Sequence, residues 1–254
     1  MARRPSEPRL SRSPLARVLC QIRWPVLNWF KPSDAADRLA DMIGRDYPLR
    51  ETHHEARVLI TPQGVTSQSG DQVTNLLTVD RSWTVALGST FLSIETVAYT
   101  DHRDFISRLG TVVDALLEGT PIPFLTRLGY RYTNRIDQPE DLANLGSYFN
   151  PLTLGPIADG EPEGLVHAAT ESLYREDRGF LLVRSALLAP NATIDPGLPP
   201  LSTKSWILDL DAYTEPTTGE LLPVDVRGLA DIQAGRARRH FATLVGTQFS
   251  ERFK

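Results

Sequence analysis

Cysteine is almost absent from this chain. A single cysteine, Cys20, occurs among 254 residues, so no disulfide can form within the chain. This scarcity fits a reducing compartment, and we expect a cytoplasmic protein. Cys20 falls on the apolar side of a predicted strand and is interpreted as a buried structural thiol, because a reactive thiol needs exposure and an electropositive surrounding. The five histidines form no pair at helical metal-binding spacing, so no metal centre is predicted.

Long apolar runs and nucleotide-binding motifs are also missing. No stretch approaches the roughly 18 apolar residues of a membrane span, and no signal-peptide segment follows the N-terminal arginines. The chain lacks the glycine-rich motifs that hold phosphates or dinucleotides and the G-x-S-x-G motif of hydrolases. We therefore predict no cofactor, no catalytic residue and no membrane partner. Binding is favoured over catalysis.

The charge balance is slightly acidic. Its 27 Lys and Arg residues against 31 Asp and Glu residues give a net charge of −4, which does not favour nucleic acid as a partner. A local exception is residues 1–14, rich in Arg, Ser and Pro, which are predicted to be a disordered basic tail. Two interpretations of this tail stay open: a solvated leader without a role, or a contact with nucleic acid or an acidic partner.

The clearest strand of the sequence is predicted at residues 125–137. Alternation divides its side chains between an apolar face and a charged face. The apolar face holds Leu128, Tyr130, Tyr132, Asn134 and Ile136. The charged face holds Arg127, Arg131, Arg135 and Asp137. We expect the apolar face to be buried against a long helix, with Asn134 hydrogen-bonded there. The three arginines form a ladder with steps of roughly 13 Å.

A second polar group lies in the strand predicted at residues 206–213. Asp209 and Asp211 share one face of that strand, although aspartate is disfavoured inside strands. Two interpretations stay open: pairing with cross-strand arginines, or an anion or metal site on an open sheet face. The candidate binding residues are Arg127, Arg131, Asn134, Arg135, Asp209 and Asp211.

The order of the predicted elements occurs twice. Residues 15–120 and residues 121–254 are each predicted to contain a strand, a helix, three strands and a helix. The first half is expected to have strands at 15–24, 54–61, 76–87 and 90–99, a loop at 62–75, a helix starting at Pro32 and a helix at 101–118. The second half is expected to have strands at 125–137, 165–176, 180–188 and 206–213, and helices at 140–149 and 225–245. The sequence thus predicts an α+β fold made of a duplicated unit. We expect antiparallel sheets joined in one domain, with the long helices packed on one face.

Four segments together carry a resemblance to a known family. They are the hydrophobic-x-x-Arg-Trp end of Leu19–Trp24, the Leu-Gly-Tyr-Arg-Tyr-Thr-Asn-Arg-Ile-Asp segment of Leu128–Asp137 with Tyr148-Phe149 after it, the Leu-Asp-Leu-Asp of Leu208–Asp211, and the final helix with Phe241. In these segments the chain resembles a sporadically distributed, functionally uncharacterised family of bacterial proteins of roughly this length. The resemblance implies a bacterial cytoplasmic protein. It implies no established activity, so no catalytic residue is carried over.

Two classes of function follow from these observations. The first is a binding module that acts on another protein, as an accessory or neutralising partner in a mobile, defence-type or toxin–antitoxin gene pair. The patchy distribution of the resembled family motivates it. The alternative is an enzyme or ligand-binding protein for a phosphorylated or nucleotide-like small molecule, held by the arginine ladder and the aspartate pair.

Overall fold

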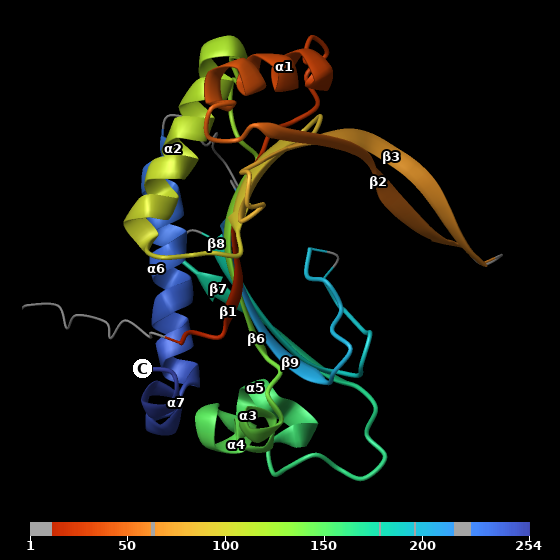
Figure 1. Cartoon of the computed structure of the whole chain (residues 1–254), viewed down its shortest axis with the longest axis vertical. Coiled ribbons are helices and arrows are strands. Elements are labelled where there is room, and N and C mark those ends of the chain that lie inside the picture. Colours follow the sequence, from red (N-terminus) through yellow and green to blue (C-terminus); the bar gives the residue numbers. More distant parts are fainter. Residues whose placement is uncertain (1–11, 62–63, 178, 196, 216–224) are drawn as a thin grey trace, which may run out of the picture.

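The computed structural model describes residues 12–61, 64–177, 179–195, 197–215 and 225–254. Within these ranges, nine strands form one antiparallel sheet in the order β2-β3-β4-β5-β1-β6-β9-β8-β7 (Figure 1). The strands are β1 (Leu15–Arg23), β2 (Leu49–Thr61), β3 (Gly64–Leu77), β4 (Trp83–Leu87), β5 (Phe91–Thr96), β6 (Arg127–Ile136), β7 (Ala168–Glu176), β8 (Gly179–Leu188) and β9 (Ser205–Thr214).

Helices lie in three of the connections between these strands and after the last strand, β9. They are α1 (Pro32–Ile43), α2 (His102–Gly119), α3 (Pro139–Ala143), α4 (Leu145–Tyr148), α5 (Pro151–Leu154), the 3-10 helix η1 (Gly155–Ile157), α6 (Val226–Leu244) and α7 (Thr247–Arg252). The predicted α+β class with an antiparallel sheet is confirmed. Within the described ranges, none of the helices combines the length and apolar character needed to cross a membrane.

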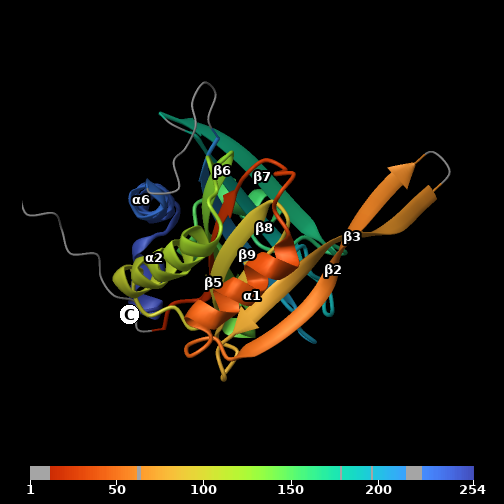
Figure 2. The same cartoon turned by 90° about the horizontal axis from the view of Figure 1, so that it is seen from above.

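The first half of the chain has one strand more than predicted. Residues 62–75 were expected to be a loop because they are rich in Gly, Ser and Gln. That prediction is wrong for β3, which pairs antiparallel with β2 and extends away from the rest of the sheet (Figure 2); residues 62–63 lie outside the described ranges. Backbone pairing stabilises this hairpin despite its polar composition, which local propensity does not capture.

A second correction concerns the strand predicted at residues 76–87. The structure divides it into the end of β3 and the separate strand β4. Asp80 causes the break, because its carboxylate accepts hydrogen bonds from the Thr78 hydroxyl at 2.6 Å and the Ser82 backbone N–H at 3.1 Å. Arg81 between them adopts a positive φ of 58°. Side chains that bond their neighbouring backbone are typical of turns.

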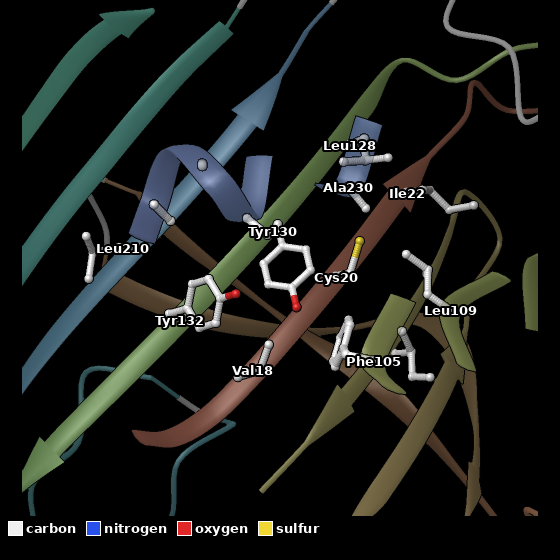
Figure 3. Packing of buried hydrophobic residues seen from close by; sticks show 14 of the residues in the cluster. Val18, Cys20, Ile22, Phe105, Leu109, Leu128, Tyr130, Tyr132, Leu210 and Ala230 are labelled. Atoms are coloured by element: carbon white, nitrogen blue, oxygen red, sulfur yellow. The ribbon is translucent and has the colours of Figure 1, made fainter. Parts of the chain in front are cut away.

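The main core lies on one face of β1 and β6, the two central strands. Val18, Cys20 and Ile22 of β1 lie beside Leu128 and Tyr130 of β6 (Figure 3). The expectation that the apolar face of β6 is buried is confirmed, since all five of its side chains are buried. Cys20 is a free, buried thiol, as predicted, and burial raises the pKa of that thiol far above its usual range.

Residues of the two long helices α2 and α6 contribute to this core. Phe105 of α2 packs on the ring of Tyr130, with ring centroids 5.1 Å apart (Figure 3). Helix α6 contacts β6 and β9, and its residues Ala230 and Ala234 are fully buried. Alanine has a short side chain, so the axis of α6 can approach the sheet closely.

The predicted basic tail falls mainly on residues 1–11, which lie outside the described residues. Its last residues, 12–14, are hydrogen-bonded to the fold: Arg12 N–H donates to the Phe253 carbonyl at 3.2 Å, and the Arg135 N–H donates to the Pro14 carbonyl at 2.8 Å. Residues 12–14, which were predicted to belong to the tail, are therefore part of the fold. The division into repeats at residues 15–120 and 121–254 stays a prediction.

Candidate functional site

The charged side chains lie on the other face of β6, away from Tyr130 and Tyr132. That face is hollowed across β1–β6 and β9, with a volume of about 640 Å³. We call this region the hollow. Of the predicted site residues, Arg127, Arg131 and Asp211 line it. Asp209 lies beside Asp211 on the same face of β9 and is covered by its partners.

Asp209 is the most buried charge on this face, with 1% of its surface exposed. Its carboxylate accepts hydrogen bonds from Arg131 Nε, from the Thr133 hydroxyl at 2.9 Å and from Arg184 Nη2 at 2.9 Å. Thr133 of β6 and Arg184 of β8 lie directly opposite Asp209 in the sheet register. Of the two interpretations of the aspartate pair, cross-strand pairing with arginine is the geometry found at Asp209.

Arg131 links Asp209 to a second carboxylate, Asp195. Its Nη2 lies 2.8 Å from Asp195 Oδ2. Asp195 belongs to the segment between β8 and β9, where it also accepts a hydrogen bond from the Gly197 N–H at 2.9 Å. Arg17 of β1 reaches the same carboxylate, with Nη1 at 3.1 Å from Oδ2. Two arginines thus flank one buried carboxylate.

The network continues from Arg17 to β5. Arg17 Nε donates to Glu95 Oε2 at 2.8 Å. The order of charges along the face is therefore Glu95, Arg17, Asp195, Arg131, Asp209, Arg184, with negative and positive groups in strict alternation. Each arginine in this row has a carboxylate on at least one side. These ion pairs fix the positions of the side chains before any ligand binds.

Arg127 occupies the other end of the hollow. Its Nη2 lies 2.9 Å from Asp211 Oδ2, and its guanidinium sits 4.4 Å from the centre of the Tyr213 ring. Gly129 makes room for this position, because a Cβ at that residue would lie 2.7 Å from Arg127 Nη1. Absence of a side chain at residue 129 therefore lets Arg127 lie along the sheet.

Arg23 of β1 lies directly opposite Arg127 in the register and also lines the hollow. It is exposed, and its Nε donates to Gln21 Oε1 at 2.7 Å. Among the residues that the structure describes, no carboxylate pairs with Arg23. Like charges placed directly opposite each other destabilise a sheet. Asp211 and Glu215 lie 2.9 Å and 3.8 Å from the Arg127 guanidinium, so Arg23 is the arginine of this pair that an incoming anion can neutralise.

Two predicted site residues lie elsewhere. Asn134 is on the core face of β6, buried, and its Nδ2 donates to the Leu208 carbonyl at 3.4 Å. Arg135 is beyond the hollow, where its Nη1 donates to the Pro199 carbonyl at 2.8 Å. Neither lines the hollow. Alternation alone assigns Asn134 to the opposite face from the arginines.

Four members of the charged row were not identified from the sequence: Arg17, Glu95, Arg184 and Asp195. For the first three, alternation within β1, β5 and β8 puts the side chain on one face, but the strand order that joins those faces is a tertiary property. Asp195 lies between strands in a segment with several prolines, and no local pattern marks it.

The environment of Asp195 gives a testable pH dependence. Burial raises the pKa of this carboxyl, but the Arg131 and Arg17 guanidinium groups outweigh burial, so the pKa falls below its ordinary 3.8. A carboxyl with a lowered folded pKa stabilises the fold above its unfolded pKa and loses that effect as pH falls through the folded pKa. The destabilisation caused by Asp195→Asn should therefore be largest near neutral pH and shrink below about pH 4.

Urea denaturation of wild type and Asp195→Asn, in steps from about pH 7 to pH 3, measures this dependence. Asp159→Asn is the matched control, because Asp159 is exposed. A difference between wild type and Asp195→Asn that stays constant over the whole range would contradict the assigned ion pairs.

Comparisons with known proteins add no assignment to this site. No protein-family model matches the chain, and no curated protein matches it. Within the described ranges, no three His, Cys, Asp or Glu side chains are grouped so as to hold a metal ion.

Proposed function

We propose that this protein is a binding module and that the hollow receives an acidic segment of another protein. The observation that carries this proposal is the Arg23 end of the hollow, where two arginines face each other across β1 and β6 and Arg23 has no carboxylate partner in the described residues. An incoming carboxylate relieves the repulsion and forms charge-assisted hydrogen bonds, which are stronger than neutral ones.

Contacts within the charged row favour anion binding at Arg23, at the end of the hollow, over anion binding at Arg131, in the middle of the row. An anion placed at Arg131 must displace Asp209 or Asp195, both of which are buried and already bonded to it. An anion at Arg23 displaces only the amide oxygen of Gln21. Displacing the Gln21 amide oxygen costs less free energy than displacing a buried carboxylate. We therefore place the incoming anion at Arg23, beside Arg127.

The remaining lining suits a peptide backbone. Gln21, Ser93 and Thr84 supply donors and acceptors along the hollow. Asn75 also lines it, and the buried Oδ1 of Asn75 has no hydrogen-bond partner within the described part of the chain. A buried acceptor without a donor is costly, and a backbone N–H of an inserted segment would satisfy it.

A phosphorylated or nucleotide-like small molecule is the second candidate ligand. Phe91 of β5 lies directly opposite Arg23, and Tyr213 lies under the Arg127 guanidinium. Aromatic rings beside arginines can stack a base while the guanidinium groups bind its phosphates. This arrangement makes nucleotides the appropriate competitor for the peptide.

Binding to the Arg23 end is tested with Arg23→Ala. A short peptide containing several Asp and Glu residues should bind wild type at low salt, and Arg23→Ala should weaken it at least about tenfold, since a hydrogen bond to a charged group contributes roughly 1.5–3 kcal/mol. Isothermal titration calorimetry measures both. The matched peptide carries Asn and Gln instead, and Arg103→Ala removes an exposed arginine from α2.

The result distinguishes the two candidates. Equal weakening by Arg23→Ala and Arg103→Ala would show only bulk electrostatics and would reject the site. Tight, Arg23-dependent binding of a nucleoside phosphate without peptide binding would replace the first candidate by the second. An affinity capture from the native host, comparing wild type with Arg23→Ala, then identifies the physiological ligand.

The cellular location and the biological role of this protein are also proposals. We propose a bacterial, cytoplasmic protein that acts as an accessory or neutralising partner within a mobile or defence-type gene pair. The single cysteine and the family resemblance support the location. A toxin-like gene adjacent to this one would support the gene pair, and consistent neighbours of a metabolic type would contradict it.

We also propose that the fold arose by duplication. β1 and β6 pair at the centre of the sheet, and the strands outward from them are β5, β4 and β3 on one side and β9, β8 and β7 on the other. The additional strand β2 extends the first side only. Helices α2 and α6 follow the two sets of strands and run along the same side of the sheet in Figure 1. This approximate symmetry supports two copies of one unit, with a long helix of each on one face.

A further inference from the structure

Strand β7 forms one outer edge of the sheet. It pairs with β8 on one side, and within the described residues no strand pairs with its other side. Residues 171–175 are all exposed, and Leu173 has 57% of its surface exposed. An unpaired edge with exposed apolar side chains is a template for pairing with another strand.

The register of the β7–β8 hairpin determines which backbone groups of β7 are free. Glu176 lies opposite Gly179 where the hairpin closes. A pair this close to the turn exchanges its N–H and C=O groups, and such pairs alternate along an antiparallel ladder. The backbone groups of Arg175, Leu173 and Glu171 therefore point away from β8, toward the free edge.

We propose that β7 pairs antiparallel with β7 of a second copy of this chain, with the two-fold axis at Leu173. In this register Leu173 lies opposite Leu173 of the second copy. Glu171 lies opposite Arg175 of the second copy, and by symmetry Arg175 lies opposite Glu171. The two sheets become continuous, with one apolar contact on the two-fold axis and two pairs of opposite charges in cross-strand positions.

Charge complementarity selects this register over its neighbours. Centring the pair on Glu171 or on Arg175 places two like charges directly opposite each other. Centring it on Tyr174 places Glu171 opposite Asp177 of the second copy, and centring it on Ser172 places Glu171 opposite Leu173. Only the register centred on Leu173 joins both charged residues to a partner of opposite sign, and it also uses the outward-pointing backbone groups.

Glu171, Leu173 and Arg175 are exposed and can contact a second copy of the chain. Glu171 and Leu173 lie opposite Arg184 and Leu182 of β8, so both project from the sheet face that bears the hollow. Arg175 rests over the Phe180 ring, with its guanidinium 5.6 Å from the ring centre. Residues 171–175, the part of β7 that the proposed pairing uses, are all exposed within the described structure.

Charge reversal tests this pairing. Analytical ultracentrifugation of the full chain should show a concentration-dependent dimer. Glu171→Arg and Arg175→Glu should each raise the dimer dissociation constant by at least about tenfold, because each converts two attractive pairs into two repulsive ones. The double variant Glu171→Arg/Arg175→Glu should regain dimerisation. An equimolar mixture of the two single variants should form a heterodimer, because every charged pair in it is of opposite sign.

Disulfide trapping gives a second, independent readout. Leu173→Cys places two thiols opposite each other on the two-fold axis, within reach of a disulfide, and mild oxidation should yield a covalent dimer. Ala169→Cys is the matched control, since its two copies lie far apart in the proposed register. Wild type that stays monomeric at high concentration would overturn the proposal. Equal dissociation constants for wild type and both single variants, or equal trapping at residues 169 and 173, would overturn it too. Pairing with a different protein at β7 would appear as a monomer here.

Discussion

Replacing Asp209 with alanine is expected to lower the free energy of unfolding by about 3–5 kcal/mol, the cost of breaking a buried ion pair from one side. The carboxylate is 1% exposed and accepts hydrogen bonds from Arg131, Thr133 and Arg184. Arg131 retains Asp195 after the substitution, but within the described residues Arg184 loses its carboxylate partner.

Equilibrium urea denaturation at neutral pH measures this change. Glu161→Ala is the matched control, because Glu161 forms an exposed pair with Lys204 at 2.5 Å, and exposed pairs contribute about 0–1 kcal/mol. A loss below about 1 kcal/mol for Asp209→Ala would mean that the row of charges is not what holds this face of the sheet together.

Replacing Tyr130 with alanine is expected to cost about 3–5 kcal/mol, in the range for large-to-small substitutions of aromatic core residues. Tyr130 is fully buried, and its ring packs on Phe105 and on Tyr132, with ring centroids 5.1 Å apart in both cases. Removal of the ring leaves a cavity between β6 and α2 that neither rigid element can close.

Tyr130→Phe separates the ring from its hydroxyl. The Tyr130 hydroxyl is buried without a hydrogen-bond partner in the described part of the structure, and burial raises the pKa of this hydroxyl well above its usual value, so it stays neutral. A buried hydroxyl without a partner costs about 1–3 kcal/mol, so its removal should leave the free energy of unfolding unchanged or raise it by up to that amount. Chemical denaturation measures the free energy of unfolding of both variants. An equal loss for Tyr130→Phe and Tyr130→Ala would contradict the argument that packing of the ring stabilises the core.

Local patterns predicted the elements whose signals are strong. β6 follows from alternation between Tyr130, Tyr132 and the arginines. Helix α2 follows from its apolar stripe and from Asp101, whose side chain accepts a hydrogen bond from the Asp104 N–H at the helix start. β3 was missed because its polar residues resemble a loop, and only pairing with β2 makes it a strand.

The candidate site was predicted in part for the same reason. Arg127, Arg131, Asp209 and Asp211 lie on two strands with visible alternation, and the register of β6 and β9 brings them together. Arg23 was not identified, because its importance depends on lying opposite Arg127, and nothing within β1 reveals which strand is its neighbour. A binding face made by five or more strands is a property of strand order, which a single sequence does not encode locally.

The central position of β1 has a consequence for the order of folding. β1 leaves the ribosome first, yet both of its neighbours are made later: Val18 lies opposite Thr96 of β5 and opposite Tyr132 of β6. Until β6 is synthesised, one edge of β1 has no strand to pair with. The apolar side chains of β1 then lack the contacts that they make with β6 in the folded protein. Such long sequence separations slow folding, and nascent chains with open edges are prone to associate. During synthesis, the first half of this protein is therefore expected to depend on protection until β6 inserts beside β1.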